Sequence, residues 1–190
     1  MKNGTNLIAL SLALLSAGCA TTGAPLPQSA AMRSGSSPVI RVDDRMDLAT
    51  RLLDVHNRER AAVGVPALRW DPELAVAAAS YGPALSALGR LVHSDRAGRP
   101  GQSENLSMGT RGAYSPEYMV GTWASEKSMF RPGIFPDVST TGNWLDVSHY
   151  TQMISRTTTA VGCAVHSDRN WDYLICRYSP KGNRDGERMP

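Results

Sequence analysis

The chain has 190 residues, of which 42% are hydrophobic, and this length and composition suit a single domain with a sizeable core. It carries 20 Lys and Arg against 17 Asp and Glu, a net charge of only +3. These cations are scattered along the sequence, whereas binding to a phosphate backbone needs clustered cations. The composition therefore argues against a nucleic-acid partner.

Residues 1–18 have the pattern of a secretory signal peptide. Lys2 supplies a positive charge, and residues 7–15 form an apolar run that ends in small residues. The run is too short to span a bilayer, which needs about 20 apolar residues. Because Cys19 follows Ala-Gly directly, the stretch resembles a bacterial lipoprotein signal, and we expect a lipid on this cysteine. The alternative is a secreted soluble protein that is cut near Ala20 or Ala24.

Three cysteines are present, and an odd number in an exported protein needs an explanation. Cys163 and Cys176 lie in two short apolar runs that are separated by a polar turn, which is the pattern of a β-hairpin. If these two residues face each other, Val161 meets Tyr178 on the same apolar face. The strand register and the pairing of the cysteines then agree, and together they predict a disulfide between Cys163 and Cys176. Such a disulfide stabilises the folded state by about 3 kcal/mol. Cys19 remains for the lipid.

Residues 19–42 are expected to be the lipidated cysteine and a flexible tether. The stretch is rich in Ala, Thr, Gly, Pro and Ser and cannot bury enough surface to order itself. About 22 such residues span roughly 25 Å, which would hold a domain clear of a membrane surface. We place the folded domain at residues 43–183 and interpret residues 184–190 as a charged tail without core residues.

The apolar periodicity predicts helices and one long loop. A first helix is capped near Asp43 and ends at Gly64. A second has Asp71 as its N-cap and Pro72 at its first position, and we expect Gly82-Pro83 to kink it without ending it. Its buried face is predicted to contain Leu74, Ala78, Tyr81, Leu85 and Leu88. A third helix begins at Ser115-Pro116, and residues 130–143 show no periodicity and are predicted to form a loop.

Glu126 is an anomaly in the third helix. Its spacing puts it on the same helical face as Met119, Trp123 and Phe130. A carboxylate at this place is either the edge of an amphipathic stripe or a buried acid that needs a partner. The periodicity alone leaves both possibilities open.

Five segments, taken in order, resemble the CAP superfamily of cysteine-rich secretory proteins, antigen 5 and plant pathogenesis-related proteins. They cover about residues 45–183 and imply a three-layer α/β/α sandwich with a mostly antiparallel central sheet. The segments are the block around His56-Asn57, then Glu104-Asn105-Leu106, then Trp123 with Glu126, then His149 to Met153 with Val161-Gly162-Cys163, and finally Cys176 to Pro180 with Gly182-Asn183.

By this resemblance a polar cleft is formed by His93, Glu104, Glu126 and His149. Two neighbouring positions depart from the family pattern, since Ser103 and Ser148 replace glycines. Glycine permits backbone angles that serine resists, so the local geometry is open to change at these two positions.

The chemistry of this tetrad allows three kinds of site. His93 and His149 can bind a divalent ion, for which Zn²⁺ is the best match, or all four side chains can form a metal-free hydrogen-bonded network. In the third kind, Glu104 or Glu126 acts as a general base beside a metal-bound water. No His-Glu-x-x-His or Gly-x-Ser-x-Gly motif is present. We expect Ser94 to be a turn or cap residue.

The remaining histidines have simpler interpretations. His56 is expected to be a helix histidine with satisfied hydrogen bonds rather than a ligand, and His166, beside the hairpin turn, is expected to be exposed. Phe130, Ile134 and Phe135 either line an apolar ligand site or anchor their loop.

The resemblance implies an exported protein of the cell envelope, attached to a membrane through Cys19, that binds a lipid, a sterol or another apolar ligand without catalysis. The alternative is a metal-dependent hydrolase or protease that uses the same tetrad, and a third possibility is a purely structural envelope module. We expect a monomer.

The lipid anchor is tested by mass spectrometry of the mature protein. We expect the N-terminal residue to be Cys19 carrying a diacylglyceryl group, and the Cys19→Ser variant to be released from membranes. A mature N-terminus at Ala20 or beyond, without lipid, would contradict the anchor.

Overall fold

The computed structural model describes the backbone of residues 42–190 and the side chains of residues 48–190. The predicted signal peptide, Cys19 and almost all of the tether lie outside the described residues, as does the side chain of Asp43. In the described part, no helix is long and apolar enough to span a membrane. In chain order the elements are α1 (Val42–Ala62), β1 (Arg69–Trp70), α2 (Pro72–Leu88), η1 (Arg96–Gly98), β2 (Ser103–Thr110), α3 (Pro116–Ser125), η2 (Glu126–Met129), β3 (Gly133–Ile134), η3 (Trp144–Val147), α4 (Ser148–Ile154), β4 (Ala160–Ser167), β5 (Trp171–Ser179) and β6 (Arg188–Met189).

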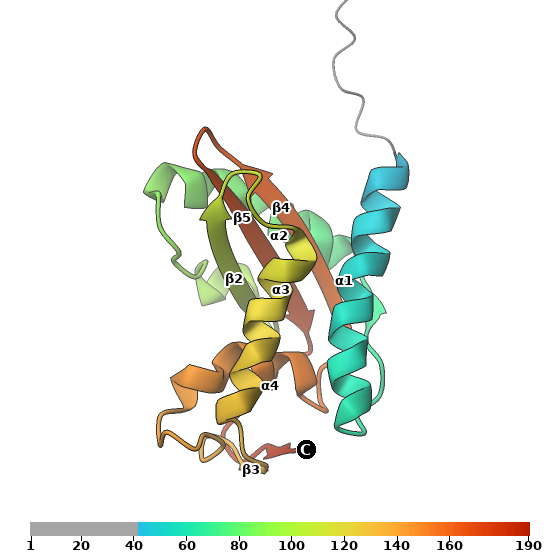
Figure 1. Ribbon diagram of the computed structural model, residues 1–190, viewed down its shortest axis with the longest axis vertical. Helices are drawn as coiled ribbons and strands as arrows, with labels where there is room; N and C mark the ends of the chain where they lie inside the picture. Colours follow the sequence, from blue (N-terminus) through green and yellow to red (C-terminus); the bar gives the residue numbers. More distant parts are fainter. Residues whose placement is uncertain (1–41) are drawn as a thin grey trace, which may run out of the picture. The chain divides into compact units, whose positions relative to one another are not determined.

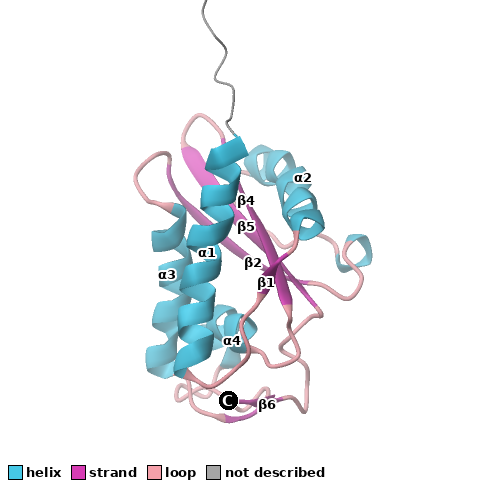
Figure 2. Ribbon diagram, turned by 90° about the vertical axis from the view of Figure 1, so that its right-hand side faces the viewer, coloured by secondary structure: helices cyan, strands magenta, loops and turns pink. Residues whose placement is uncertain are grey.

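The central sheet has the strand order β1-β4-β5-β2. The β1–β4 pair is parallel, while β4–β5 and β5–β2 are antiparallel. Helix α2 covers one face of this sheet, and α1, α3 and α4 cover the other (Figures 1 and 2). The predicted three-layer α/β/α sandwich with a mostly antiparallel sheet is therefore confirmed.

Each face of the sheet has its own apolar core, and the strands supply both. Side chains alternate between the two faces of a strand, so neighbouring residues of β5 enter different clusters. The larger cluster, under α1, α3 and α4, includes Leu174, Cys176 and Tyr178. The smaller cluster, under α2, includes Tyr173 and Ile175.

Helix α2 begins as the sequence predicts. The Asp71 side chain accepts a hydrogen bond from the backbone N–H of Glu73 at 3.0 Å, Pro72 occupies the first position, and the helix continues through Pro83. The predicted apolar face runs one turn too far, because Leu88 in the last turn is 49% exposed while Leu85 is fully buried. The sheet contacts of this face therefore end before the helix does.

The hairpin β4–β5 has the predicted register, with Cys163 opposite Cys176 and Val161 opposite Tyr178. The predicted disulfide between the two cysteines is present. Gly162, between these positions, lies directly beneath the start of α2. A Cβ atom at Gly162 would lie 2.3 Å from the backbone nitrogen of Ala75. The absence of a side chain at Gly162 thus lets α2 approach the sheet.

The C-terminal segment corrects one prediction. Strand β6 pairs with β3, and Met189 is only 2% exposed and belongs to the larger core. The interpretation of residues 184–190 as a tail without core residues is therefore wrong, and the predicted loop at 130–143 contains a short strand. Two-residue strands whose paired residues lie 54 and 56 positions apart leave no local periodicity from which they could be predicted.

Helix α1 carries buried polar side chains that are fully paired. His56 is 0% exposed; its Nδ1 donates to the Leu52 carbonyl at 2.7 Å, and its Nε2 accepts from the Tyr178 hydroxyl at 2.9 Å. The prediction of a satisfied helix histidine is confirmed. Arg60, 1% exposed, donates to four backbone carbonyls, those of Pro66, Met153, Ser155 and Thr158.

Gly162 and Gly121 form a matched pair for testing the close approach of α2. We expect Gly162→Ala to lower the free energy of unfolding by about 1–3 kcal/mol or more, because the new methyl group overlaps the backbone of α2. Gly121 lies in α3 with open space at its Cβ position, so Gly121→Ala should leave stability equal or raise it by about 0.5–1 kcal/mol. Urea unfolding measures both changes, and equal stability of the two variants would contradict the packing argument.

Burial lowers the pKa of His56 to about 4, although its hydrogen bond to Leu52 opposes the shift. Since this value lies below that of an unfolded histidine, about 6.5, the folded state disfavours the proton. The contribution is complete above about pH 6.5 and is lost as the pH falls towards 4, and it amounts to about 3 kcal/mol. The unfolding free energy of His56→Gln should therefore depend less steeply on pH across this window than that of the wild type. Equal slopes would show that His56 does not titrate on unfolding.

Candidate functional site

The first pair of predicted site residues is His93 and Glu104, which lie in the loop after α2 and at the second position of β2. Nδ1 of His93 donates to Oε1 of Glu104 at 2.8 Å. The same carboxylate accepts from the backbone N–H of Ser94 at 3.0 Å and from its hydroxyl at 2.9 Å. The Glu104 side chain is 0% exposed and the His93 side chain 56% exposed. His93 therefore connects a buried carboxylate with the surface.

Arg177 completes the surroundings of Glu104. The two residues lie opposite each other on β5 and β2, and Nε of Arg177 is 3.0 Å from Oε2 of Glu104. This approach lies off the N–H direction, so the contact is an ion pair rather than an aligned hydrogen bond. Burial alone would raise the pKa of Glu104, but the hydrogen bonds from His93 and Ser94 and the charge of Arg177 outweigh it, and the pKa is lowered.

The second pair is Glu126 and His149, at the first position of η2 and the second of α4. Nδ1 of His149 donates to Oε1 of Glu126 at 2.6 Å. Oε2 of Glu126 accepts from the backbone N–H groups of His149 and Tyr150, each at 3.0 Å. Trp123 stacks on the His149 ring with a centroid distance of 5.9 Å. Glu126 is half-buried, with its side chain 17% exposed, so it lies between the two interpretations, and it has the partner that the second one requires.

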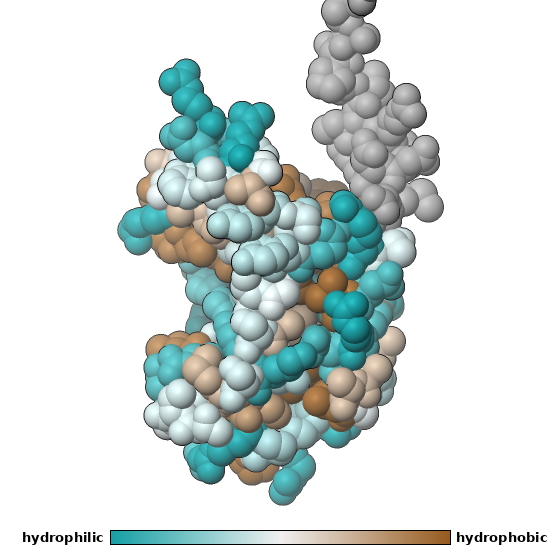
Figure 3. All heavy atoms as spheres, in the orientation of Figure 1, coloured by the Kyte–Doolittle hydropathy of each residue, from teal (hydrophilic) through white to brown (hydrophobic). Residues whose placement is uncertain are grey.

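Asn105 links the second pair to the sheet. Its amide nitrogen donates to the backbone carbonyl of His149 and to the Tyr178 hydroxyl, both at 3.2 Å. Adjacent residues of β2 thus contact the two His–Glu pairs, Glu104 as a member of one and Asn105 as a support of the other. The surface is hollowed at the left edge of Figure 3, at the height where Figure 1 shows the beginning of β2 above α4.

The two pairs, His93–Glu104 and His149–Glu126, are called the dyads below. In each dyad Nδ1 of the histidine is held by a carboxylate, and Nε2 is left to accept a proton or a metal ion. A carboxylate behind a histidine is the arrangement typical of metal-binding histidines, because it sets the tautomer and the ring orientation. Within residues 48–190, no three His, Cys, Asp or Glu side chains converge closely enough to hold a metal ion. Nε2 of His93 and Nε2 of His149 are thus the two nitrogen donors that the dyads offer to a ligand.

The serines that replace the family's glycines are accommodated without strain. Ser148 has ordinary right-handed helical angles, with φ −64° and ψ −34°. Ser103 pairs with Tyr178 as the first residue of β2. The backbone at these positions therefore does not require glycine.

Phe130, Ile134 and Phe135 do not share one environment. Phe135 is 4% exposed and belongs to the larger core, where it meets Trp144 edge-on. Phe130 is partly buried against Tyr150, whereas Ile134 is 43% exposed. Phe135 thus matches the loop-anchor interpretation.

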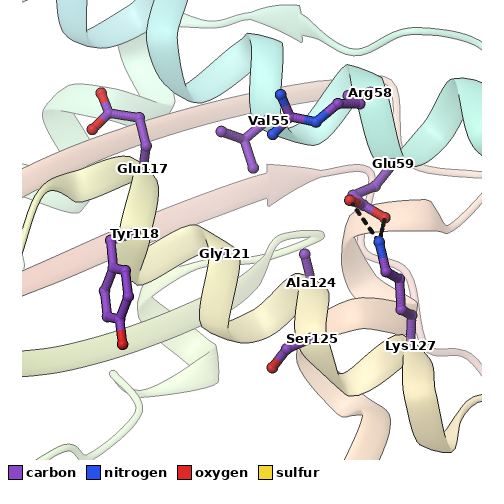
Figure 4. A pocket seen from close by; sticks show the side chains of 9 residues that line it. All are labelled: Val55, Arg58, Glu59, Glu117, Tyr118, Gly121, Ala124, Ser125 and Lys127. Atoms are coloured by element: carbon purple, nitrogen blue, oxygen red, sulfur yellow. Dashed lines mark hydrogen bonds and ion pairs between the residues drawn. The ribbon is translucent and has the colours of Figure 1, made fainter.

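A groove that sequence reasoning missed lies between α1 and α3 (Figure 4). It has a volume of about 400 Å³. Val55 and Ala124 supply apolar surface, Gly121 leaves it open, and an ion pair between Glu59 and Lys127 closes one side at 3.1 Å. Tyr118, which is 58% exposed, also lines the groove. The full lining is Val55, Arg58, Glu59, Glu117, Tyr118, Gly121, Ala124, Ser125 and Lys127.

Arg177 and Ser94 are the dyad contacts that the sequence analysis did not assign. A usable signal exists for Arg177, since it is the only charged residue of the apolar run from Tyr173 to Tyr178. A cation inside a buried strand needs an acidic or carbonyl partner. For Ser94, which contacts Glu104 rather than a substrate position, no sequence signal exists beyond its place beside His93.

Curated proteins from plants and a yeast are similar to this chain over most of its length. Pathogenesis-related protein 1A of Nicotiana tabacum is 38% identical over 136 residues, which are 71% of this chain and 76% of the relative. The PR-1 type protein of Sambucus nigra is 33% identical over 137 residues, 72% of this chain and 78% of the relative. Secreted protein RBT4 of Candida albicans is 34% identical over 153 residues but is matched over only 39% of its length.

Solved structures share the fold. Na-ASP-1 matches with a TM-score of 0.64 at 23% identity over 74% of this chain and 40% of its own. The crystal structure of NaASP2 with Zn²⁺ matches with a TM-score of 0.60 at 22% identity, over 74% of this chain and 83% of its own. The model of the family described as the Cysteine-rich secretory protein family (CAP) covers residues 53–178. Since this model covers well over half of the chain and relatives more than 30% identical are matched over more than two thirds of their length, the chain belongs to the CAP family.

Proposed function

We propose that this CAP-domain chain is an exported, non-enzymatic binding protein of the cell envelope, and that His93 and His149 hold a divalent metal ion, Zn²⁺, in its site. The observation that carries the proposal is that both histidines keep Nε2 free while Nδ1 donates to a carboxylate. The related fold of NaASP2 has been solved with Zn²⁺. Two nitrogen ligands make a weak site, since structural zinc sites use four ligands.

Binding is favoured over hydrolysis because both carboxylates are already occupied. Glu104 accepts three hydrogen bonds, from His93 and twice from Ser94, and Glu126 also accepts three, from His149 and Tyr150. A general base must be within reach of the proton that it removes from water. A metal-dependent hydrolase would have to break these contacts first.

Export is supported by the sequence pattern of residues 1–18 and by a relative that is named a secreted protein. A lipid on Cys19 would keep the domain attached to a membrane of the envelope. This attachment is proposed from the sequence pattern and is tested by the mass spectrometry described above.

A lipid or sterol is proposed as the second ligand, and the groove between α1 and α3 is its site. The groove combines the apolar surface of Val55 and Ala124 with charged side chains at its rim, Arg58 and Lys127 among them. Glu59 and Glu117 balance these two cations, so the lining suits a ligand with an apolar body and a polar head.

The two sites are separable with one variant each. His149→Ala removes one proposed metal ligand, and we expect the dissociation constant for Zn²⁺, measured by calorimetry, to rise at least tenfold. Gly121→Leu fills the groove from a position whose Cβ has open space, so it should leave Zn²⁺ uptake unchanged.

A fluorescent fatty acid or sterol should give the opposite result, with binding weakened by Gly121→Leu and unchanged by His149→Ala. Melting temperatures of both variants establish that they are folded. Equal Zn²⁺ uptake by His149→Ala and the wild type would refute the metal site, and equal probe binding by Gly121→Leu and the wild type would refute the groove.

A further inference from the structure

The two dyads are held in different ways. The carboxylate of Glu126, on η2, is bound by N–H groups of α4, the same helix that carries His149, so the second dyad is anchored at the start of α4. The carboxylate of Glu104 is held from the sheet, and its charge faces the guanidinium of Arg177. Between residues 48 and 190, no cation is paired with Glu126 apart from its own histidine.

The loop that carries His93 has no apolar anchor of its own. Between Gly89 and Gln102 the only buried residue is Arg99, and every apolar side chain is at least partly exposed. Polar contacts therefore hold this loop to the domain. Within the loop, Arg99 donates to the carbonyls of Ser94 and Gln102, and from α2 the Tyr81 hydroxyl donates to the carbonyl of Val92 at 2.7 Å. The carboxylate of Glu104 binds His93 and Ser94 directly.

Arg177 is the side chain through which the sheet holds this carboxylate. It is 5% exposed, its partner Glu104 is 0% exposed, and the strand register places the two opposite each other. The guanidinium also lies over the Tyr81 ring at 5.9 Å from its centre, so its position is fixed from the side of α2 as well. A buried ion pair that loses one partner leaves the other charge uncompensated.

We infer that Arg177 is a positioning residue for His93: it holds the Glu104 carboxylate, and through that carboxylate it sets the ring orientation and the Nδ1–H tautomer that leave Nε2 of His93 free for a ligand. The inference depends on the proposed metal function only in the identity of the ligand that Nε2 of His93 would bind. Arg177 itself touches neither histidine nor ligand.

The test uses the metal-free, ¹⁵N-labelled protein at a pH where its histidines are neutral. Long-range ¹H–¹⁵N spectra distinguish an imidazole that carries its proton on Nδ1 from one that carries it on Nε2. In the wild type we expect His93 and His149 to carry it on Nδ1. In Arg177→Met, His93 should shift towards the Nε2–H form, while His149 keeps its signal and serves as the internal control.

The same variants are then titrated with Zn²⁺. Arg177→Met should raise the dissociation constant about tenfold or more, as changes behind a metal-binding histidine do, and Arg177→Lys should restore part of the wild-type behaviour. Ile175→Val shortens a fully buried side chain on the same face of β5, so it controls for a general loss of stability and should leave His93 unchanged. If Arg177→Met does not fold, Arg177→Gln, which keeps a hydrogen-bond donor, is compared with the wild type in its place.

Wild-type signals for His93 in the folded Met or Gln variant would overturn the inference. A wild-type protein that binds no Zn²⁺ would refute the proposed metal function, while the tautomer comparison in the metal-free protein would still decide the role of Arg177. The two failures are thus distinguishable.

Discussion

Strand β2 lies against β5 with Glu104 opposite Arg177 and Ser103 opposite Tyr178. Because successive side chains of a strand point to opposite faces, Glu104 and Arg177 meet on the face under α2. Asn105 points the other way and reaches both Tyr178 and the carbonyl of His149. A slip of one residue in this register would exchange the faces and disconnect both dyads from the sheet. The site therefore depends on strand pairing as much as on its four named side chains.

Buried polar side chains connect this register to the helices. Tyr178 donates to His56 on α1 and accepts from Asn105 on β2, so one hydroxyl joins a helix, a strand and the support of His149. The guanidinium of Arg60 connects α1 with the end of α4 and with the segment before β4, because it donates hydrogen bonds to backbone carbonyls of both. Each contact satisfies a group whose burial would otherwise be costly. Such contacts give a binding site rigid supports that packing of apolar side chains does not supply.

Local patterns in the sequence predicted most of the fold. The cap at Asp71, the start of α3 at Pro116 and the pairing of Cys163 with Cys176 each follow from a few neighbouring residues. The resemblance, together with helical periodicity at Glu126, selected the residues of both dyads. Arg177 and Met189 were missed for a different reason. Their roles arise from partners 73 and 56 positions away, at Glu104 and Gly133, and no local period records such contacts.

Strand β5 lies between β4 and β2, yet it is the last of the long strands in the chain. Strand β2 therefore has no partner in the sheet until residues 171–179 are available, and Met189, which enters the larger core, follows later still in the chain. A chain with this order cannot complete its sheet while its C-terminal part is still held elsewhere. If the domain crosses a membrane as an unfolded chain, its sheet cannot close before β5 has followed β2 across. The late position of the central strand would then keep the domain open for transport until β5 emerges.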